Sequence, residues 1–240
     1  MDFASVAGTQ QRATPEHALT KTTSLPYHRA LNWRWRPSSL CNRSCGVAFL
    51  VHRRHSELAQ KELFHPPASL RGRLGAVWLR TDGMDLLAVV DYVPPKSLKQ
   101  HEAAAKKMTK WIEVVYDRCG RRTMLLFGGD FNNDFGLCRN SDGRVASSRG
   151  KEIGGRKPMC ENVVGAETRR MCVDSYLTIA STLFTESGPT YHGTDGHTSR
   201  IDNCTIPAGA LQLVKAGACR PFAPRRRATT FRWSPRWSTA

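Results

Sequence analysis

The chain has 240 residues, 40% of them hydrophobic, and 36 Lys and Arg residues against 20 Asp and Glu residues give it a net charge of +16. This length supports one domain with a sizeable core, and the absence of an apolar run of about 18 residues excludes a membrane-spanning protein. The charge predicts a polyanionic partner, with nucleic acid ahead of a phospholipid surface.

The beginning of the chain has no basic region followed by an apolar stretch, so we expect no secretory signal. An intracellular monomer is predicted, nuclear or cytoplasmic and not secreted. The eight cysteines then favour reduced thiols. Cys41 and Cys45 form a C-x3-C pair, but no second pair with suitable histidines follows, which argues against zinc.

Three strands are predicted in the first half of the chain. Residues 1–45 are poorly patterned and read as a loop-rich segment. Residues 46–52, 74–80 and 86–92 are short apolar runs typical of strands. Asp82-Gly83 lies between the last two, which predicts a hairpin.

A helix is predicted over residues 97–117, because five apolar side chains share one face: Met108, Trp111, Ile112, Val115 and Tyr116. Residues 123–127 follow as a strand buried on both faces, and residues 133–158 as a polar loop. A second helix is expected over 168–180, and strands over 190–192 and 199–206. Residues 220–240 contain several arginines and no acid, so we expect a disordered basic tail. Strands and helices interleave between residues 46 and 219, which indicates a mixed α/β domain.

The strongest candidate site follows the strand at residues 123–127. Gly128 and Gly129 let a ligand approach the backbone closely, and Asp130 and Asn132 share one side by the two-residue period. A carboxylate there can hold Mg²⁺ or orient a water, and an amide can bind a phosphate oxygen. The alternative is a polar turn that closes a buried strand.

Two weaker candidates lie elsewhere in the chain. Tyr92 ends the strand at 86–92, where a tyrosine is often only an amphipathic rim residue. Arg200 and Asp202 alternate with Ile201 and are expected to face one side, although such a pair is often a surface ion pair.

Together, LAVVDYVPP, LLFGGDFN and GPTYH followed by SRIDN resemble the endonuclease/exonuclease/phosphatase superfamily, in its order and roughly its spacing. The resemblance covers residues 46–207, and GVAFLV at 46–51 resembles a strand of retrotransposon endonuclease domains. It implies a DNase I-like, four-layered α/β sandwich of the α+β type. It also implies a Mg²⁺- or Mn²⁺-dependent DNA endonuclease derived from a retroelement.

The resemblance assigns a role to each matching residue. Asp130 would orient or deprotonate the attacking water, Asn132 would contact the scissile phosphate, and Tyr92 would hydrogen-bond it. Asp202 would orient a histidine, and Arg200 would contribute to substrate binding. Glu16 is the match for the metal-binding glutamate, although Pro15 stands where the family has glutamine, so an ordinary exposed glutamate is the alternative.

Two departures limit the expected activity. Residues 1–14 show no strand bearing the family's metal-site asparagine, and no Ser-Asp-His follows Asp202. We therefore expect a truncated or decayed copy, or a reading frame that is wrong near Cys219, lacking the first and last family strands and with weak or absent catalysis. Two alternatives stay open: a phosphatase or phosphodiesterase for lipid or small phosphate esters, and a non-catalytic remnant that binds nucleic acid.

Overall fold

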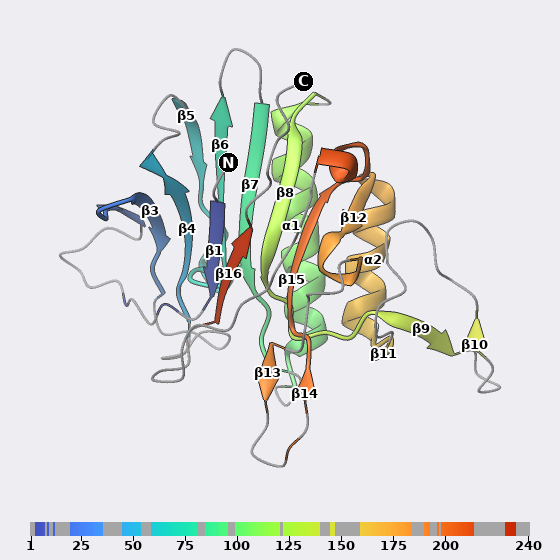
Figure 1. Cartoon of the computed structure of the whole chain (residues 1–240). Coiled ribbons are helices and arrows are strands. Elements are labelled where there is room, and N and C mark those ends of the chain that lie inside the picture. The colour runs from blue at the N-terminus through green and yellow to red at the C-terminus, as the bar shows by residue number, and fades with distance from the viewer. Residues whose placement is uncertain are drawn as a thin grey trace.

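The chain folds as a mixed α/β protein with two large sheets and two helices (Figure 1). The computed structural model describes residues 3–7, 9, 12, 20–35, 45–53, 59–80, 85–95, 99–120, 122–139, 145–146, 159–183, 190–192, 196, 198–213 and 229–233. All statements below concern these residues.

A six-stranded sheet forms the centre of the molecule, in the order β12-β15-β8-β7-β6-β5. Its strands are β5 (Ala59–Phe64), β6 (Leu74–Arg80), β7 (Asp85–Tyr92), β8 (Met124–Asp130), β12 (Leu177–Ile179) and β15 (Asp202–Pro207). The pair β7–β8 is parallel and the other pairs are antiparallel. A parallel pair needs a crossover, and helix α1 (His101–Cys119) provides it.

A five-stranded antiparallel sheet, in the order β16-β1-β4-β3-β2, lies beside the first. Its strands are β1 (Phe3–Ala7), β2 (Thr20–Ser24), β3 (His28–Trp33), β4 (Val47–His52) and β16 (Thr229–Trp233). Two small sheets combine β9 (Gly136–Arg139), β10 (Val145–Ala146) and β11 (Met159–Cys160), and β13 (Tyr191–His192) with β14 (Thr198–Ser199). Short 3₁₀ helices span Ala68–Leu70, Ala180–Thr182 and Ala208–Leu213.

The two large sheets pack face to face through one apolar core. Leu31 and Phe49 of the five-stranded sheet belong to the same buried cluster as Val77 and Val90 of the six-stranded sheet. Trp33 crosses between them: its Nε1 donates a hydrogen bond to the carbonyl of Phe64 at 3.1 Å. This packing fixes which face of β7, β8 and β15 points toward the five-stranded sheet.

Helices α1 and α2 (Val163–Asp174) cover the opposite face of the six-stranded sheet (Figure 1). Met108 and Ile112 of α1 and Met171 of α2 form a second core with Leu125 and Phe127 of β8. Both described helices lie on this face, so the described residues form three layers. The fourth layer of the predicted sandwich is not among them.

Several predicted elements are confirmed. The expected strands at 46–52, 74–80, 86–92 and 123–127 correspond to β4, β6, β7 and β8, and the expected helix at 97–117 corresponds to α1. The predicted hairpin is present, because β6 and β7 pair antiparallel with Leu79 opposite Leu86.

Other expectations were wrong. The second helix begins earlier, because the Asn162 side chain accepts a hydrogen bond from the Gly165 N–H at 2.7 Å and caps it. It ends at Asp174, since Tyr176 adopts a positive φ of 54° that a helix does not allow, and β12 then takes residues 177–179. The expected loop at 133–158 contains β9 and β10.

The two ends of the chain contain strands that the sequence did not indicate. Three strands, β1 to β3, occupy the segment expected to be loop-rich, and β1 lies where residues 1–14 suggested none. Strand β16 lies within the segment expected to be a disordered tail, and it pairs with β1. β1 and β16 pair with each other and β1 also pairs with β4, partners far away in the sequence that local patterns do not reveal, whereas β2 and β3 form a local hairpin that the sequence reasoning missed.

Within the described residues, neither helix is long and apolar enough to span a membrane. The cysteines whose side chains are described (Cys45, Cys119, Cys172 and Cys204) are buried thiols.

Candidate active site

Three of the predicted site residues form a single row across neighbouring strands. Tyr92 lies opposite Asp130 in the parallel pair β7–β8, and Asp130 lies opposite Asp202 in the antiparallel pair β8–β15. Tyr92 packs against the core between the two sheets, as does Cys204, two residues after Asp202. Because alternate residues share a face, the row points toward the five-stranded sheet. Tyr92 and Asp202 are 38 and 72 positions away from Asp130 in the sequence, yet they lie on the strands next to it.

The two glycines before Asp130 are required by close packing. A Cβ on Gly129 would lie 2.0 Å from the carbonyl oxygen of Asp91, and one on Gly128 would lie 3.2 Å from Ser5 Oγ. A side chain at residue 129 would force the backbone of β7 or β8 to shift, so the two strands approach this closely only because residue 129 is glycine.

Phe131 anchors the end of β8 on the helical side. Its ring stacks on Phe127 with centroids 4.6 Å apart and contacts Phe135 edge-on at 6.1 Å. This confirms that Phe131 points away from the face that bears Asp130.

Asn132 departs from the expectation that it would continue the alternation of the strand. Strand β8 ends at Asp130, and Asn132 has a φ of 42°, so the two-residue period does not extend to it. Its backbone N–H donates to Asp130 Oδ1 at 3.1 Å, and its Nδ2 donates to the carbonyl of Val93 at 2.8 Å. Asn132 therefore ties the end of β8 to the end of β7 and uses one of its two amide N–H donors to do so.

The row is unusually rich in buried carboxyl groups. Asp130 and Asp202 are 6% and 3% exposed. Burial, followed by the charge of Asp202, raises the pKa of Asp130 well above its ordinary value of 3.8, and the N–H of Asn132 opposes this rise. Burial raises the pKa of Asp202 to about 7, against a hydrogen bond from the Thr190 side chain. Asp202 can therefore exchange a proton near neutral pH, as acid–base catalysis requires.

Asp91 is a third buried carboxyl that the sequence reasoning missed. It is 1% exposed, and burial followed by the charges of Asp130 and Asp202 raises its pKa well above the ordinary value. No donor among the described residues reaches its buried Oδ1. The sequence signal that could have identified Asp91 is an acidic residue inside the apolar run of β7, since acidic residues are seldom fully buried unless they are paired.

Arg73 was also missed and supplies the positive charge of the site. It is 1% exposed, its guanidinium carbon lies 4.6 Å from the centroid of the Tyr92 ring, and its Nη1 donates to the Tyr92 carbonyl at 3.3 Å. Burial and Asp130 raise the pKa of the Tyr92 hydroxyl while Arg73 lowers it. The phenol stays protonated near neutral pH and is therefore available as a hydrogen-bond donor.

The remaining predicted residues are placed differently. Arg200 is half-buried, and its Nη1 donates to the carbonyl of Ser181 at 2.7 Å, so it contributes to the packing beside β15. Glu16, the predicted metal ligand, lies outside the described residues.

The donor set suits a divalent cation, although no group of three or more His, Cys, Asp or Glu side chains among the described residues is arranged around one point. Mg²⁺ in proteins is commonly held by one or two carboxylates, with water and substrate phosphate oxygens completing its shell. Asp130 and Asp202 offer such oxygens from adjacent strands, and a bound cation would favour their ionised forms.

Comparisons with known proteins place the fold. No family model and no curated protein matches the chain. Among solved structures, the endonuclease domain of TRAS1, a telomere-specific non-LTR retrotransposon, matches with a TM-score of 0.53 and 18% identity over 88% of this chain and 81% of that one. The AP endonuclease LMAP from Leishmania major matches with a TM-score of 0.58 and 10% identity, over 87% of this chain and 70% of that one. The 3'-5' exonuclease NExo from Neisseria meningitidis matches with a TM-score of 0.53 and 15% identity over 80% and 75%.

These likenesses are three-dimensional, since the identities are low. They show a DNase I-like fold, the fold that the motifs around Tyr92, Asp130 and Asp202 predicted.

Proposed function

We propose that this DNase I-like fold carries a Mg²⁺-dependent phosphodiester hydrolase site directed at DNA, derived from a retroelement endonuclease and of low turnover. The observation that carries the proposal is the row of Tyr92, Asp130 and Asp202 on one face of the sheet, with the buried Arg73 against Tyr92. The similarity to a retrotransposon endonuclease domain and the net charge of +16 support DNA as the substrate.

Each side chain has a task that its surroundings support. Asp130, with one carboxylate oxygen held by the Asn132 N–H, uses the other to orient a water and accept its proton, which its raised pKa favours. The protonated Tyr92 hydroxyl donates to a phosphate oxygen, and the charge of Arg73 stabilises negative charge there. Asp202 holds a proton close to neutral pH. When bound, Mg²⁺ would neutralise phosphate charge.

Low turnover is proposed because no Ser-Asp-His follows Asp202 in the sequence. Loss of an acid–base group typically slows such a reaction by about 10²–10⁴-fold. The fold, the carboxylate row and the missing histidine together favour a slow nuclease over a fully active one.

A plasmid-nicking assay in Mg²⁺ tests the proposal. We expect slow nicking by the wild type that EDTA abolishes, that Asp130→Ala reduces about 10²–10⁴-fold, the contribution of a general base, and that Asp174→Asn leaves unchanged. Asp174 is an exposed residue at the end of α2 and serves as a matched control. Salt-sensitive DNA binding without nicking would instead favour a non-catalytic remnant, and hydrolysis of an inositol phosphate without nicking would favour the phosphatase alternative.

A further inference from the structure

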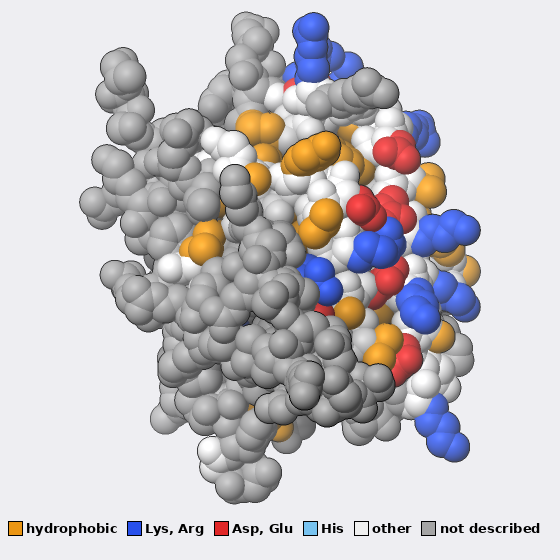
Figure 2. Space-filling model, turned by 90° about the vertical axis from the view of Figure 1, so that its right-hand side faces the viewer, with side chains coloured by type: hydrophobic (Ala, Val, Ile, Leu, Met, Phe, Trp, Pro, Cys, Tyr) orange, Lys and Arg blue, Asp and Glu red, His pale blue; other side chains and the backbone are white. Residues whose placement is uncertain are grey.

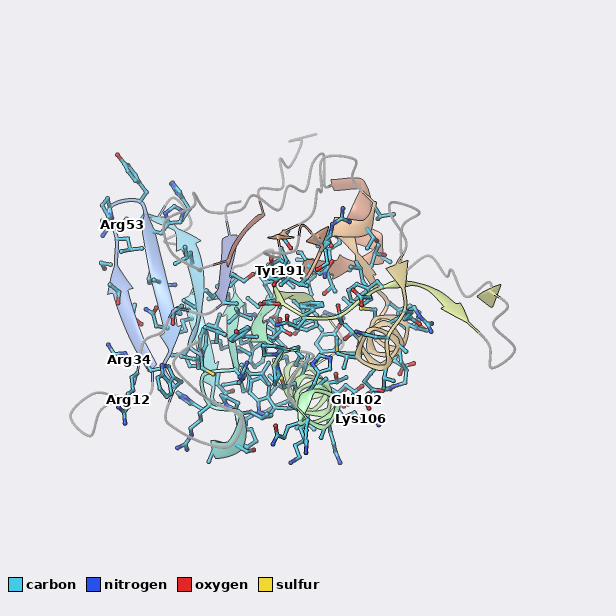
Figure 3. The ribbon with its side chains drawn as sticks, turned by 90° about the horizontal axis from the view of Figure 1, so that it is seen from below. Arg12, Arg34, Arg53, Glu102, Lys106 and Tyr191 are labelled. Atoms are coloured by element: carbon cyan, nitrogen blue, oxygen red, sulfur yellow. The ribbon has the colours of Figure 1, made fainter. Side chains whose placement is uncertain are left out.

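A second polar cluster lies where strand β3 ends. Arg12 forms an isolated β-bridge with Trp35, and its guanidinium carbon lies 5.7 Å from the centroid of the Trp35 ring. Arg34 immediately precedes Trp35. Figure 3 shows Arg12 and Arg34 at the same end of the five-stranded sheet, while Arg53 lies apart from them.

Among the described residues, the cluster contains several buried donors that have no acceptor. Thr9 Oγ1, Arg34 Nε and Trp35 Nε1 are buried and have no hydrogen-bond acceptor within the described part of the chain. Backbone contacts hold this region together: Thr9 N–H donates to Gly46 at 2.9 Å, Gly46 N–H donates to Gly72 at 2.7 Å, and a Cβ on Gly72 would lie 2.3 Å from that of Trp35. A buried donor without an acceptor costs about 1–3 kcal/mol, so this concentration indicates a place for an anion.

The positive charge of this cluster is not balanced by carboxylates of the described residues. On the helical side, Arg169 pairs with Glu161, and Arg170 pairs with three carboxylates of α1 and α2. Figure 2 accordingly shows acidic and basic side chains interleaved on that side. By contrast, neither Arg12 nor Arg34 has an ion pair with any described acidic residue.

The cluster is connected to the candidate active site by direct contacts. Trp35 packs against Gly72, and the next residue, Arg73, lies over the ring of Tyr92. A polyanion held by the cluster would therefore be close to the row of Tyr92, Asp130 and Asp202.

We propose that Arg12 and Arg34 form a phosphate-binding site for the nucleic-acid backbone, with Trp35 positioning the Arg12 guanidinium. Arginine binds phosphate through paired N–H donors, and its stacking on an aromatic ring restricts its motion before binding. The inference rests on the proposed function, because it places a phosphate away from the scissile bond. Nucleic acid is the occupant that the overall charge of the chain favours.

Binding of a short fluorescent DNA duplex, measured by anisotropy in EDTA so that no cleavage occurs, tests this site. We expect Arg12→Gln and Arg34→Gln each to weaken binding roughly tenfold, the effect of losing one charged hydrogen bond. Each is also expected to reduce the slope of log affinity against log salt by about one. Arg53→Gln, an exposed arginine at the other end of β4, is the matched control and should bind as the wild type does.

Arg12 is exposed, so its substitution leaves folding intact, and thermal melts verify this for each variant. Equal weakening by all three variants, or none by Arg12→Gln and Arg34→Gln, overturns the site. The site is also overturned if Arg12→Gln and Arg34→Gln lose binding to phosphatidylserine vesicles while their DNA binding is unchanged, because the cluster would then bind a membrane surface. If Arg12→Gln and Arg34→Gln bind DNA as tightly as the wild type and the protein still nicks DNA, the site is refuted and the proposed function stands. Weakened DNA affinity of Arg12→Gln and Arg34→Gln, with no nicking by the wild type or any variant, would support the site and refute the proposed function.

Discussion

The buried carboxyl of Asp202 predicts a specific dependence of stability on pH. Its pKa rises from the ordinary value of 3.8 to about 7 in the folded protein. The folded state therefore binds this proton more tightly than the unfolded state, so the stabilisation is complete at acid pH and is lost as pH rises from about 4 to about 7. A shift of this size corresponds to about 4 kcal/mol across that window.

The perturbation is Asp202→Asn, which keeps the shape of the side chain and removes its titration. In EDTA, we expect the free energy of unfolding of the wild type to fall relative to that of the variant by up to about 4 kcal/mol between about pH 4 and about pH 7. Urea unfolding followed by circular dichroism measures this difference at each pH. The exposed Asp174→Asn variant should differ from the wild type by no more than about 1 kcal/mol throughout.

Mg²⁺ gives a second measurement on the same pair of proteins. If Asp130 and Asp202 bind the cation, its addition near neutral pH should stabilise the wild type more than Asp202→Asn, because the ion favours the charged carboxylates. A wild-type advantage that grows with pH in EDTA would contradict the reasoning, since it would mean that the ionised form of Asp202 is favoured by folding.

Two further predictions concern residues that support the row. Arg73→Met should destabilise the protein by about 3–5 kcal/mol in urea unfolding, because it leaves the buried Asp130 carboxylate without the positive charge that compensates it. It should also move the acid limb of any nicking activity to higher pH, since Arg73 lowers the pKa of Asp130. Gly129→Ala should lower the free energy of unfolding by about 1–3 kcal/mol through its clash with Asp91. Gly209→Ala should leave the free energy of unfolding unchanged, because a Cβ there meets nothing within 4 Å. Equal destabilisation by the two substitutions would refute the packing argument.

Much of the central sheet could be predicted from local sequence. The apolar runs at β6 and β7 with Asp82-Gly83 between them specify a hairpin, and the apolar face of α1 specifies a helix that returns the chain to β8. In these elements, neighbours in sequence are also neighbours in space. The pattern therefore contains the information that decides the structure.

The two ends of the chain are different in this respect. β1 and β16 are more than 200 positions apart in sequence and pair with each other. Their short, weakly alternating segments become strands because a partner of distant origin satisfies their backbone hydrogen bonds. No local pattern at residues 3–7 or 229–233 contains that partner, so the sequence suggested loop and tail.

The sequence by itself determined the centre of the candidate site: the two glycines that permit close strand packing, and Asp130 at the strand end. Only the tertiary structure decided that Tyr92 and Asp202 lie in register on either side of Asp130, that Arg73 is buried against Tyr92, and that Asn132 turns back toward Val93. The physical reason is that strand register and burial depend on contacts between distant segments. Those contacts determine which carboxyls share a low-dielectric environment, and burial there raises their pKa above the ordinary value.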